Sequence, residues 1–389
     1  MCPTFKATGS ELDTPRARAN IIREMLSFSC ADDPLSENIV KNALDNCLMC
    51  KACKRECPSN VDITKLKSEV LQHHYDKHGY PLSVLMINSL PKFQQVGSMF
   101  PSIYNWFVSN ALTSSALKAL MGFAPQREIP KIYPCNFSKQ FDQAKKANDR
   151  TIYLFIDEFS RFQDTSIAKT AIKLFSALGF EVKQAPIEES GRMAISKGMV
   201  KRAKRLAERN VGILKELISE QTPLVGIEPS TTLSFRDEYP DLLGEDISSL
   251  SQNVFLFDEF IAKQADLGVI TPELFTDKKQ HILLHGHCQQ KALTGTEFME
   301  RMLCIPTNYS VEVIPSGCCG MAGSYGYEKR HYEMSKTIAN SVLIPAIEKA
   351  AADTIIAAPG TSCREQIKHF SSRTALHPIE ILYNALKEK

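Results

Sequence analysis

Apolar residues recur at helical spacing along the first third of the chain. The pattern predicts helices over residues 16–25, 36–45 and 63–78, with cysteine-bearing loops between them. From residue 81 to residue 125 the only charged side chains are Lys92 and Lys118, and large apolar residues are frequent. Such a stretch could dock a partner protein, lie at a membrane surface, or pack as ordinary helices against the rest of the chain.

A different pattern begins near residue 151, after a polar and charged segment at 136–150. The β-rich run TIYLFIDEF is followed by a helical pattern over 165–178 and a strand at 180–182. After residue 280, HILLHGHC precedes a helix and YSVEVIP supplies another strand. This alternation predicts an α/β region with parallel sheets.

The two halves of the α/β region form a degenerate internal repeat. Three segments of the first half correspond in order to three of the second: FIDEFSRF to LLHGHCQQK, ESGRMA to CCGMAG, and GIEPSTT to APGTSC. The comparison sets Asp157 against Cys288, Ser190 against Cys319 and Thr231 against Cys363. Duplication predicts two similar lobes packed about a pseudo-twofold axis.

The run CLMCKACKRECP carries Cys47, Cys50, Cys53 and Cys57 as C-x2-C-x2-C-x3-C-P. This spacing places three thiolates on one cubane cluster and the fourth on a second cluster. Cys2 belongs to the only other Cys-Pro pair, so we expect a [4Fe-4S] cluster on Cys2, Cys47, Cys50 and Cys53. The alternative is a zinc site, but zinc sites use paired CxxC or Cys/His motifs at wider separation.

Cys57 then lacks partners, because the other three ligands of its cluster would precede Cys2. We expect the chain to be the downstream part of a longer polypeptide that supplies them. The alternative is that Cys57 is a spare thiol.

Four cysteines of the second half point to a second site: Cys288, Cys318, Cys319 and Cys363. Each follows a predicted strand and has glycines nearby, and strand ends in an open α/β sheet converge on a crevice. Four thiolates there could hold an iron–sulfur cluster or zinc; the alternative is a set of buried free cysteines. The first half has Glu189, Ser190 and Thr231 at the answering positions, so we expect it to bind no metal.

Two histidines flank Cys288 in this run. His285 and His287 are candidate proton donors or spare ligands, although a histidine in a strand-end loop is more often a hydrogen-bonding residue.

Composition narrows the class of protein further. The chain has 389 residues, is 43% apolar and has a formal charge of +2, which gives no electrostatic reason to expect nucleic acid as a partner. Twelve cysteines, mostly at cluster-like positions, indicate reduced thiols and hence the cytoplasm. The first ten residues lack the features of a signal peptide, and no apolar run reaches about 18 residues, so we expect no membrane span.

The cysteine module, together with SGCCGMAGSYGYEK and APGTSCREQI, resembles a known family across nearly the whole chain. It is similar to the iron–sulfur part of FAD-linked 2-hydroxy-acid dehydrogenases. This group contains glycolate oxidase iron–sulfur subunits and fused D-lactate or D-2-hydroxyglutarate dehydrogenases. The resemblance implies that a flavin domain oxidises the hydroxy acid and that this chain passes the electrons to an acceptor such as quinone.

The later lobes also resemble the cysteine-rich CCG domains of heterodisulfide reductase subunits. Family repeats commonly end in CxxC, whereas Cys363 is followed by Arg364-Glu365-Gln366, so one ligand is missing. Many relatives have CCG in the first repeat, where this chain has Glu189-Ser190-Gly191. A single CCG-type site is therefore expected.

The sequence thus predicts an α + α/β fold with three parts. These are a helical ferredoxin-like domain (1–135), a degenerate CCG-type repeat without metal ligands (151–270) and a CCG-type repeat with a metal site (271–389).

The leading functional hypothesis is an electron-transfer component that works with a flavin-containing partner in the cytoplasm, with peripheral association at the inner face of the membrane as an option. No dinucleotide-type glycine fingerprint follows a strand, so FAD is expected on the partner, and the chain alone should not oxidise a hydroxy acid. One alternative is a heterodisulfide-reductase-like protein with thiol chemistry at its own cluster. Another is a zinc-stabilised interaction module beside a ferredoxin domain.

Overall fold

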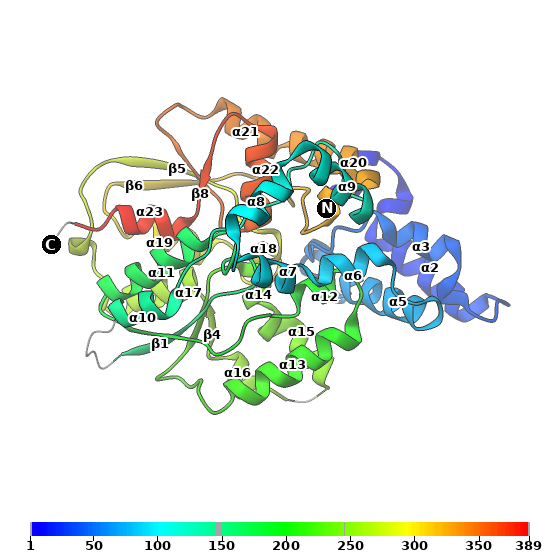
Figure 1. Cartoon of the computed structure of the whole chain (residues 1–389), viewed down its shortest axis with the longest axis horizontal. Helices are drawn as coiled ribbons and strands as arrows, with labels where there is room; N and C mark the ends of the chain where they lie inside the picture. The colour runs from blue at the N-terminus through cyan, green and yellow to red at the C-terminus, as the bar shows by residue number, and fades with distance from the viewer. Residues whose placement is uncertain (1, 145–149, 245, 388–389) are drawn as a thin grey trace.

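The computed structural model describes residues 2–144, 150–244 and 246–387. A helical region leads into two four-stranded parallel sheets, as Figure 1 shows, and the predicted α + α/β fold is confirmed. The helical region lies at one end of the molecule and wraps over one side of the sheets (Figure 1).

Nine α-helices precede residue 122 in the described chain. They are α1 (Pro3–Thr8), α2 (Pro15–Phe28), α3 (Asn38–Asp45), α4 (Ala52–Glu56), α5 (Ile63–His78), α6 (Leu82–Asn88), α7 (Leu90–Gly97), α8 (Pro101–Ser109) and α9 (Ala111–Met121). Helix α2 begins where the Thr14 side chain accepts from Ala17 N–H, and α5 begins where Asp62 accepts from Thr64 N–H. The three predicted helices are present with small shifts at their ends.

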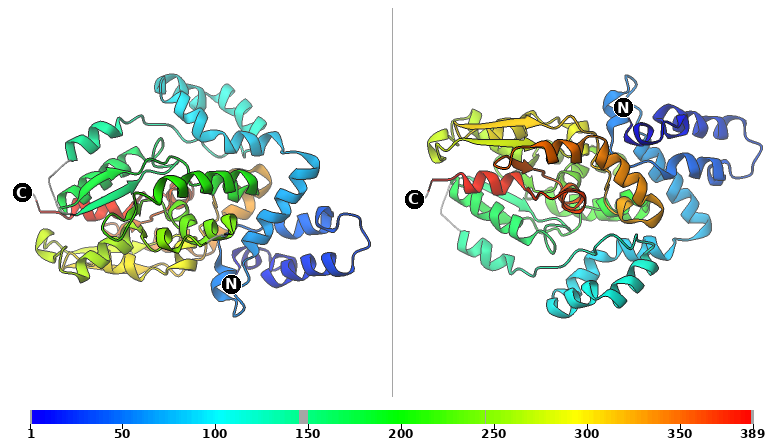
Figure 2. Two further views of the ribbon diagram at one scale, coloured as in Figure 1. Left: turned by 90° about the horizontal axis from the view of Figure 1, so that it is seen from below. Right: turned by 90° about the horizontal axis from the view of Figure 1, so that it is seen from above.

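Helices α7, α8 and α9 project from the body of the molecule (Figure 2). Their outward side chains are large and apolar: Phe93, Val96, Met99, Phe100, Ile103, Trp106, Phe107, Leu112 and Leu120 are all exposed. Lys92 and Lys118 are the charged residues of this segment. We call this set of exposed residues the apolar face; ordinary packing within the chain does not cover it.

The two sheets have the same topology. Strands β1 (Thr151–Phe155), β2 (Glu181–Gln184), β3 (Leu224–Gly226) and β4 (Val254–Leu256) are ordered β2-β1-β3-β4. Strands β5 (Gln280–Leu284), β6 (Tyr309–Val313), β7 (Ile355–Ala357) and β8 (Ala375–Leu376) are ordered β6-β5-β7-β8. Every pairing is parallel, so the carboxyl ends of each set of strands meet at one edge.

Helices connect and cover both sheets. Those of the first are α10 (Phe137–Ala144), α11 (Thr165–Ala177), α12 (Arg192–Ser196), α13 (Val200–Leu214), α14 (Pro229–Thr232), α15 (Ser234–Leu243), α16 (Ser248–Ser251) and α17 (Phe257–Asp266). Those of the second are α18 (Cys288–Leu293), α19 (Glu297–Leu303), α20 (Tyr332–Ser341), α21 (Leu343–Lys349), α22 (Thr361–Phe370) and α23 (Pro378–Asn384). We call β1–β4 with α11–α17 lobe 1, and β5–β8 with α18–α23 lobe 2.

Strand register refines the internal repeat. Leu154 pairs with Gln184 and Val225, and Leu284 pairs with Val313 and Ala357. Counting from these positions sets Glu158 against Cys288, one residue after the Asp157 expected from sequence, because the sequence comparison had no register to fix it. The matched positions are Glu158 with Cys288, Glu189 with Cys318, Ser190 with Cys319, and Thr231 with Cys363.

The lobes share one hydrophobic core. Ile152, Leu154 and Val225 of lobe 1 belong to the same buried cluster as Ile282 and Leu284 of lobe 2. The polar segment before residue 151 contributes as well, since α10 adds the buried Phe137 and Phe141 to this cluster; residues 145–149 of that segment lie outside the described chain. The boundaries at 151 and 271 stay a prediction.

Candidate iron–sulfur sites

The first cysteine site lies in the loop before α4, where the backbone takes an unusual path. Met49 and Lys51 have positive φ values of 53° and 62°, which non-glycine residues seldom adopt. Lys67 Nζ donates to the carbonyl oxygens of Asp45 (3.2 Å) and Cys47 (2.8 Å) and holds this loop in place. The loop therefore presents its cysteines in a conformation fixed by buried polar contacts.

Arg18 brings Cys2 to this loop. It is buried, donates from Nε to the Ala43 carbonyl at 2.8 Å, and places Nη1 3.4 Å from Cys2 Sγ. Burial opposes ionisation of the Cys2 thiol, but a hydrogen bond with Thr4 and the Arg18 charge outweigh it and lower the pKa of Cys2. A cationic group beside a thiol favours the thiolate form that a cluster requires.

The remaining thiols of the set lie close by. Cys50 is near enough to Cys2 and Cys47 for their charges to act on it, and Cys47 acts in the same way on Cys53. Burial, with a smaller contribution from Cys47, raises the pKa of Cys53 to about 11. Four sulfurs, two from the loop and two from the starts of α1 and α4, match the donor set of a cubane cluster. Cys57 ends α4, its N–H bound to the Cys53 carbonyl at 2.9 Å, and its ligand role stays a prediction.

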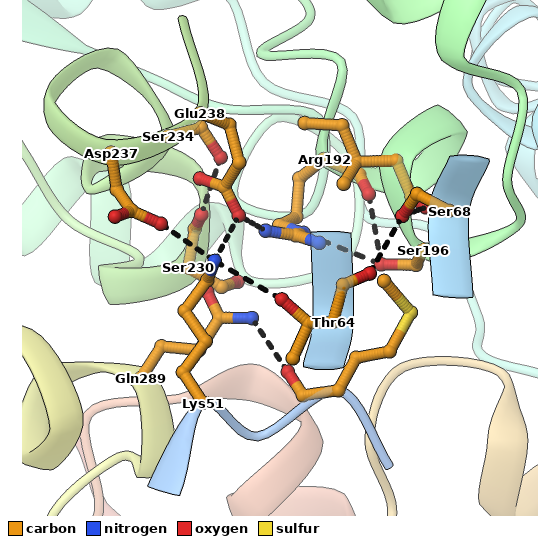
Figure 3. A network of polar contacts seen from close by, with 12 residues as sticks. Lys51, Thr64, Ser68, Arg192, Ser196, Ser230, Ser234, Asp237, Glu238 and Gln289 are labelled. Carbon is orange, nitrogen blue, oxygen red and sulfur yellow. Dashed lines mark hydrogen bonds and ion pairs between the residues drawn. The ribbon is translucent and has the colours of Figure 1, made fainter. Parts of the chain in front are cut away.

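A buried ionic network fastens the cluster loop to lobe 1 (Figure 3). Lys51 Nζ lies 3.2 Å from Asp62, 2.6 Å from Asp237 and 3.0 Å from Glu238, and its side chain has no exposed surface. Arg192 shares Glu238. Burial opposes the ammonium charge, but the three carboxylates outweigh it and raise the pKa of Lys51 above its ordinary value. The cysteine spacing gave no sign of this network.

Lobe 2 contacts the same loop and α4 through uncharged groups of its own. Gln289, the residue after Cys288, donates to the Met49 carbonyl at 3.3 Å (Figure 3), and Arg55 Nη1 donates to the Lys291 carbonyl at 2.6 Å. Cys50 and Cys288 line one small cavity of about 390 Å³. The two predicted cysteine sites are therefore neighbours.

The second site is built at the carboxyl edge of the lobe 2 sheet. Cys288 is the first residue of α18, Cys363 lies in the first turn of α22, and Cys318 and Cys319 lie in the loop after β6. The sequence placed all four in loops; two are instead in first helical turns, because the chain turns directly from strand to helix. Cys318 lies within hydrogen-bonding reach of Cys288 and Cys319, and Cys319 of Cys363.

His285 joins these thiols. Its ligand atom and those of Cys319 and Cys363 lie within 4.8 Å of one another, and all three residues are buried. Its Nδ1 shares a 2.8 Å hydrogen bond with Ser316 Oγ, which turns Nε2 toward the site. The sequence had raised His285 and His287 as proton donors or spare ligands. The structure places His285 beside two of the thiols, whereas His287 Nε2 lies 3.8 Å from a Glu228 oxygen; a ligand role for either stays a prediction.

Hydrogen bonds between neighbouring thiols shift their pKa values in opposite directions. The hydrogen bond with Cys318, against the effect of burial, lowers the pKa of Cys288 to about 6. Contacts with Cys318 and Cys363 likewise hold the pKa of Cys319 well below its usual range, while those of Cys318 and Cys363 are raised. Four soft sulfur donors and one imidazole suit an iron–sulfur cluster or zinc, and both are compatible with this donor set. Their assignment as ligands stays a prediction.

The matching positions of lobe 1 hold oxygen groups that satisfy one another. Glu158 accepts from Ser190 N–H at 3.0 Å and from Ser190 Oγ at 2.8 Å, and Thr231 Oγ1 donates to the Glu228 carbonyl at 2.9 Å. Burial, with the nearby Asp157 charge, raises the pKa of Glu158 to about 7. The Glu158–Ser190 contact was missed from sequence because the repeat was set one residue out of register.

Two neighbouring cysteine sites, one in a helical module and one at a sheet edge, are the arrangement expected of an iron–sulfur protein that transfers electrons. Comparison with known proteins agrees. A family model described as a 4Fe-4S dicluster domain matches residues 1–61, which supports a 4Fe-4S cluster in this region.

Three relatives illustrate the similarity. The chain is 25% identical to D-2-hydroxyglutarate dehydrogenase of Escherichia coli K12, covering 100% of this chain and 42% of that protein. It is 26% identical to one of the subunits of the anaerobic glycerol-3-phosphate dehydrogenase of the same organism (85% of this chain, 83% of the relative). It is 22% identical to the glycolate oxidase iron-sulfur subunit, again of Escherichia coli K12 (100% and 92%).

These homologues confirm the resemblance to iron–sulfur components of flavin-linked dehydrogenases. The chain spans about two fifths of the length of the D-2-hydroxyglutarate dehydrogenases it matches. No solved structure matches. Among the described residues, no helix combines the length and apolar character needed to cross a bilayer.

Proposed function

We propose that this chain is the electron-transfer part of an FAD-linked 2-hydroxy-acid dehydrogenase. The observation that carries the proposal is the shared cavity of Cys50 and Cys288, because adjacent redox sites can pass single electrons from one to the other. Cys2, Cys47, Cys50 and Cys53 would hold one [4Fe-4S] cluster. Cys288, Cys318, Cys319 and Cys363, with His285 beside them, would hold a second cluster.

The substrate class follows from the relatives. Their names include D-2-hydroxyglutarate dehydrogenase and glycolate oxidase, so the proposed reductant is a flavin on a partner domain or subunit that oxidises D-2-hydroxyglutarate, D-lactate or glycolate. This chain's own residues would hold the clusters, and the second is the better shielded from water, since Cys318, Cys319 and Cys363 are all at most 3% exposed. Burial and hydrogen bonds to sulfur would set the potentials.

The acceptor is proposed to be lipid-soluble. The apolar face on α7–α9 carries two lysines and no carboxylate, a combination that suits the surface of an anionic bilayer. We propose that the protein works in the cytoplasm and binds the inner face of the membrane peripherally through this surface. Co-sedimentation with anionic vesicles tests it: Phe100→Glu with Ile103→Glu should abolish binding, whereas Leu267→Glu, at an exposed leucine on another part of the surface, should not.

The electron relay is tested on protein purified without oxygen. Cys50→Ser should remove the EPR signal of the first cluster while the second remains, and Cys304→Ser, at an exposed cysteine, should change neither. In the wild type, spin–spin coupling between the two reduced clusters should broaden the spectrum, because the sites are neighbours. A wild-type spectrum equal to the sum of two independent clusters would contradict the relay.

A further inference from the structure

A second cavity, of about 900 Å³, lies between the helical region and the lobes. One end is lined by Cys47 and by the four cysteines of the lobe 2 site. The other end reaches α6, α7 and α9, where Val84, Ile87, Leu90 and Met121 form apolar walls. The cavity therefore extends from both proposed redox sites to the helices that carry the apolar face.

Four buried polar atoms of residues that line this cavity have no hydrogen-bond partner within the described chain. Two are His287 Nδ1 and His331 Nδ1, the latter 3.2 Å from a Glu328 oxygen. The Tyr325 hydroxyl and the Gln289 Oε1 atom are buried without a hydrogen-bond partner, and the residues are 7% and 6% exposed. Buried polar atoms normally find partners, since an unpaired one costs about 1–3 kcal/mol. Both residues line the cavity, so a molecule bound there would supply what they lack.

The ring of Tyr325 is held in position. It stacks on His331 with centroids 4.0 Å apart and planes 10° apart, and the His331 ring nitrogen lies 3.1 Å from Asp45. Burial raises the pKa of Tyr325 above its ordinary value, so the hydroxyl keeps its proton and can donate a hydrogen bond. A carbonyl oxygen is the natural acceptor for it.

We infer that this cavity is the binding site of a quinone, whose ring carbonyl accepts from Tyr325 and whose tail lies along α6 and α9. The inference rests on the proposed function and names its acceptor site. The apolar walls would hold the tail and the polar groups would orient the ring, as in other ligand cavities, although the lining also includes charged residues such as Lys67, Glu228 and Glu328. The apolar face lies on α7–α9, and the cavity reaches α7 and α9.

The reduction of quinone to hydroquinone balances in electrons and protons. One quinone takes two electrons, which the reduced flavin of the partner supplies through the cysteine sites, and two protons from solvent. The product hydroquinone carries two O–H groups, and the unpaired Gln289 Oε1 can accept from one of them. Tyr325 and Gln289 act here as positioning groups that hydrogen-bond the quinone and hydroquinone.

The first test is binding. Equilibrium dialysis of a short-chain naphthoquinone against the full chain should show saturable binding. Ser83→Trp places an indole at a half-buried, cavity-lining position of α6 and should weaken binding about tenfold or more, equivalent to about 1.4 kcal/mol. Ser102→Trp makes the same change at an exposed position of α8 outside the cavity, and it should leave the quinone dissociation constant within about twofold of the wild-type value. Tyr325→Phe keeps the stacked ring and should weaken binding by about threefold to tenfold.

The second test separates this inference from the relay. Dithionite-reduced protein is mixed with the quinone or with ferricyanide, a small hydrophilic oxidant, and cluster bleaching is followed. Ser83→Trp should slow oxidation by quinone and leave oxidation by ferricyanide unchanged. Equal quinone affinity and rate in Ser83→Trp and Ser102→Trp would overturn the cavity assignment while leaving the relay intact; loss of both oxidations in the wild type would instead overturn the relay.

Discussion

In lobe 2 the four strand-end positions hold Cys288, Cys318, Cys319 and Cys363; in lobe 1 the same positions hold Glu158, Glu189, Ser190 and Thr231. Both sheets keep one strand order, and Gly191 and Gly320 keep the same left-handed backbone, with φ of 80° and 91°. Lobe 1 thus has the same backbone scaffold as lobe 2 but lacks the sulfur donors. In lobe 1 a buried carboxylate and hydroxyl satisfy each other in their place.

The lobes also treat the cluster loop differently. Lobe 1 forms ion pairs with Lys51 through Asp237 and Glu238, whereas in lobe 2 the neutral amide of Gln289 donates to the Met49 carbonyl. The carboxylates that bind Lys51 therefore lie in the lobe without cysteines, and lobe 2 keeps its thiols close to Cys50. The comparison suggests a division of work: lobe 1 positions the helical module and lobe 2 exchanges electrons with it.

The largest effect is expected from Cys319→Ser. Its thiol contacts both Cys318 and Cys363, so the change should empty the lobe 2 site and remove about half of the bound iron. Iron and zinc analysis of the anaerobic protein measures this, with Cys304→Ser as the matched exposed control. Unchanged metal content would contradict a metal site in lobe 2.

Lys51→Met should destabilise the protein by up to about 3–5 kcal/mol, because it removes the buried cation shared by Asp237 and Glu238. Lys54 still pairs with Asp237 and Arg192 with Glu238, so part of the network remains. Chemical denaturation measures the loss. The control Lys201→Met breaks an exposed pair with Asp76 and should cost at most about 1 kcal/mol. Equal losses in the two variants would show that the network does not anchor the loop.

Glu158→Gln should flatten the pH dependence of stability. Burial raises the pKa of Glu158 from 4.5 to about 7, so the native state binds the proton more tightly than the unfolded state. The free energy of unfolding therefore falls as pH rises between these values, by a few kcal/mol at most at about 1.4 kcal/mol per pKa unit. Denaturation at about pH 5 and about pH 8 measures the slope. Part of it should remain in the variant, because burial also raises the pKa values of Asp157, Glu228 and Asp258. A variant with the wild-type slope would contradict this origin.

The smallest effect is expected from Glu189→Ala in lobe 1. Its ion pair with Arg202 is partly exposed, with side chains 20% and 22% accessible, so its loss should cost about 0–1 kcal/mol. Cys318→Ala, at the matched position of lobe 2, should instead lower metal content. If both variants bind metal like the wild type, the matched positions do not differ in function.

Local chemistry and periodicity were enough to predict much of this molecule. Thiol spacing predicted a 4Fe-4S cluster in the region that the family model matches, and the recurring strand-end motifs predicted the two similar sheets. The alignment of Glu158 with Cys288 was not predicted, because a comparison of motifs does not count residues along paired strands. The Lys51 network and the 900 Å³ cavity were not predicted from sequence. Both join residues that are far apart in sequence and come close only when the lobes pack together.

The most direct test of the account is the count of iron, zinc and acid-labile sulfide per chain in protein purified without oxygen, with EPR after dithionite reduction. The account predicts about eight iron, a similar amount of sulfide and no zinc, because both cysteine sites hold clusters. About four iron with one zinc would confine electron transfer to the helical region and contradict the relay through lobe 2.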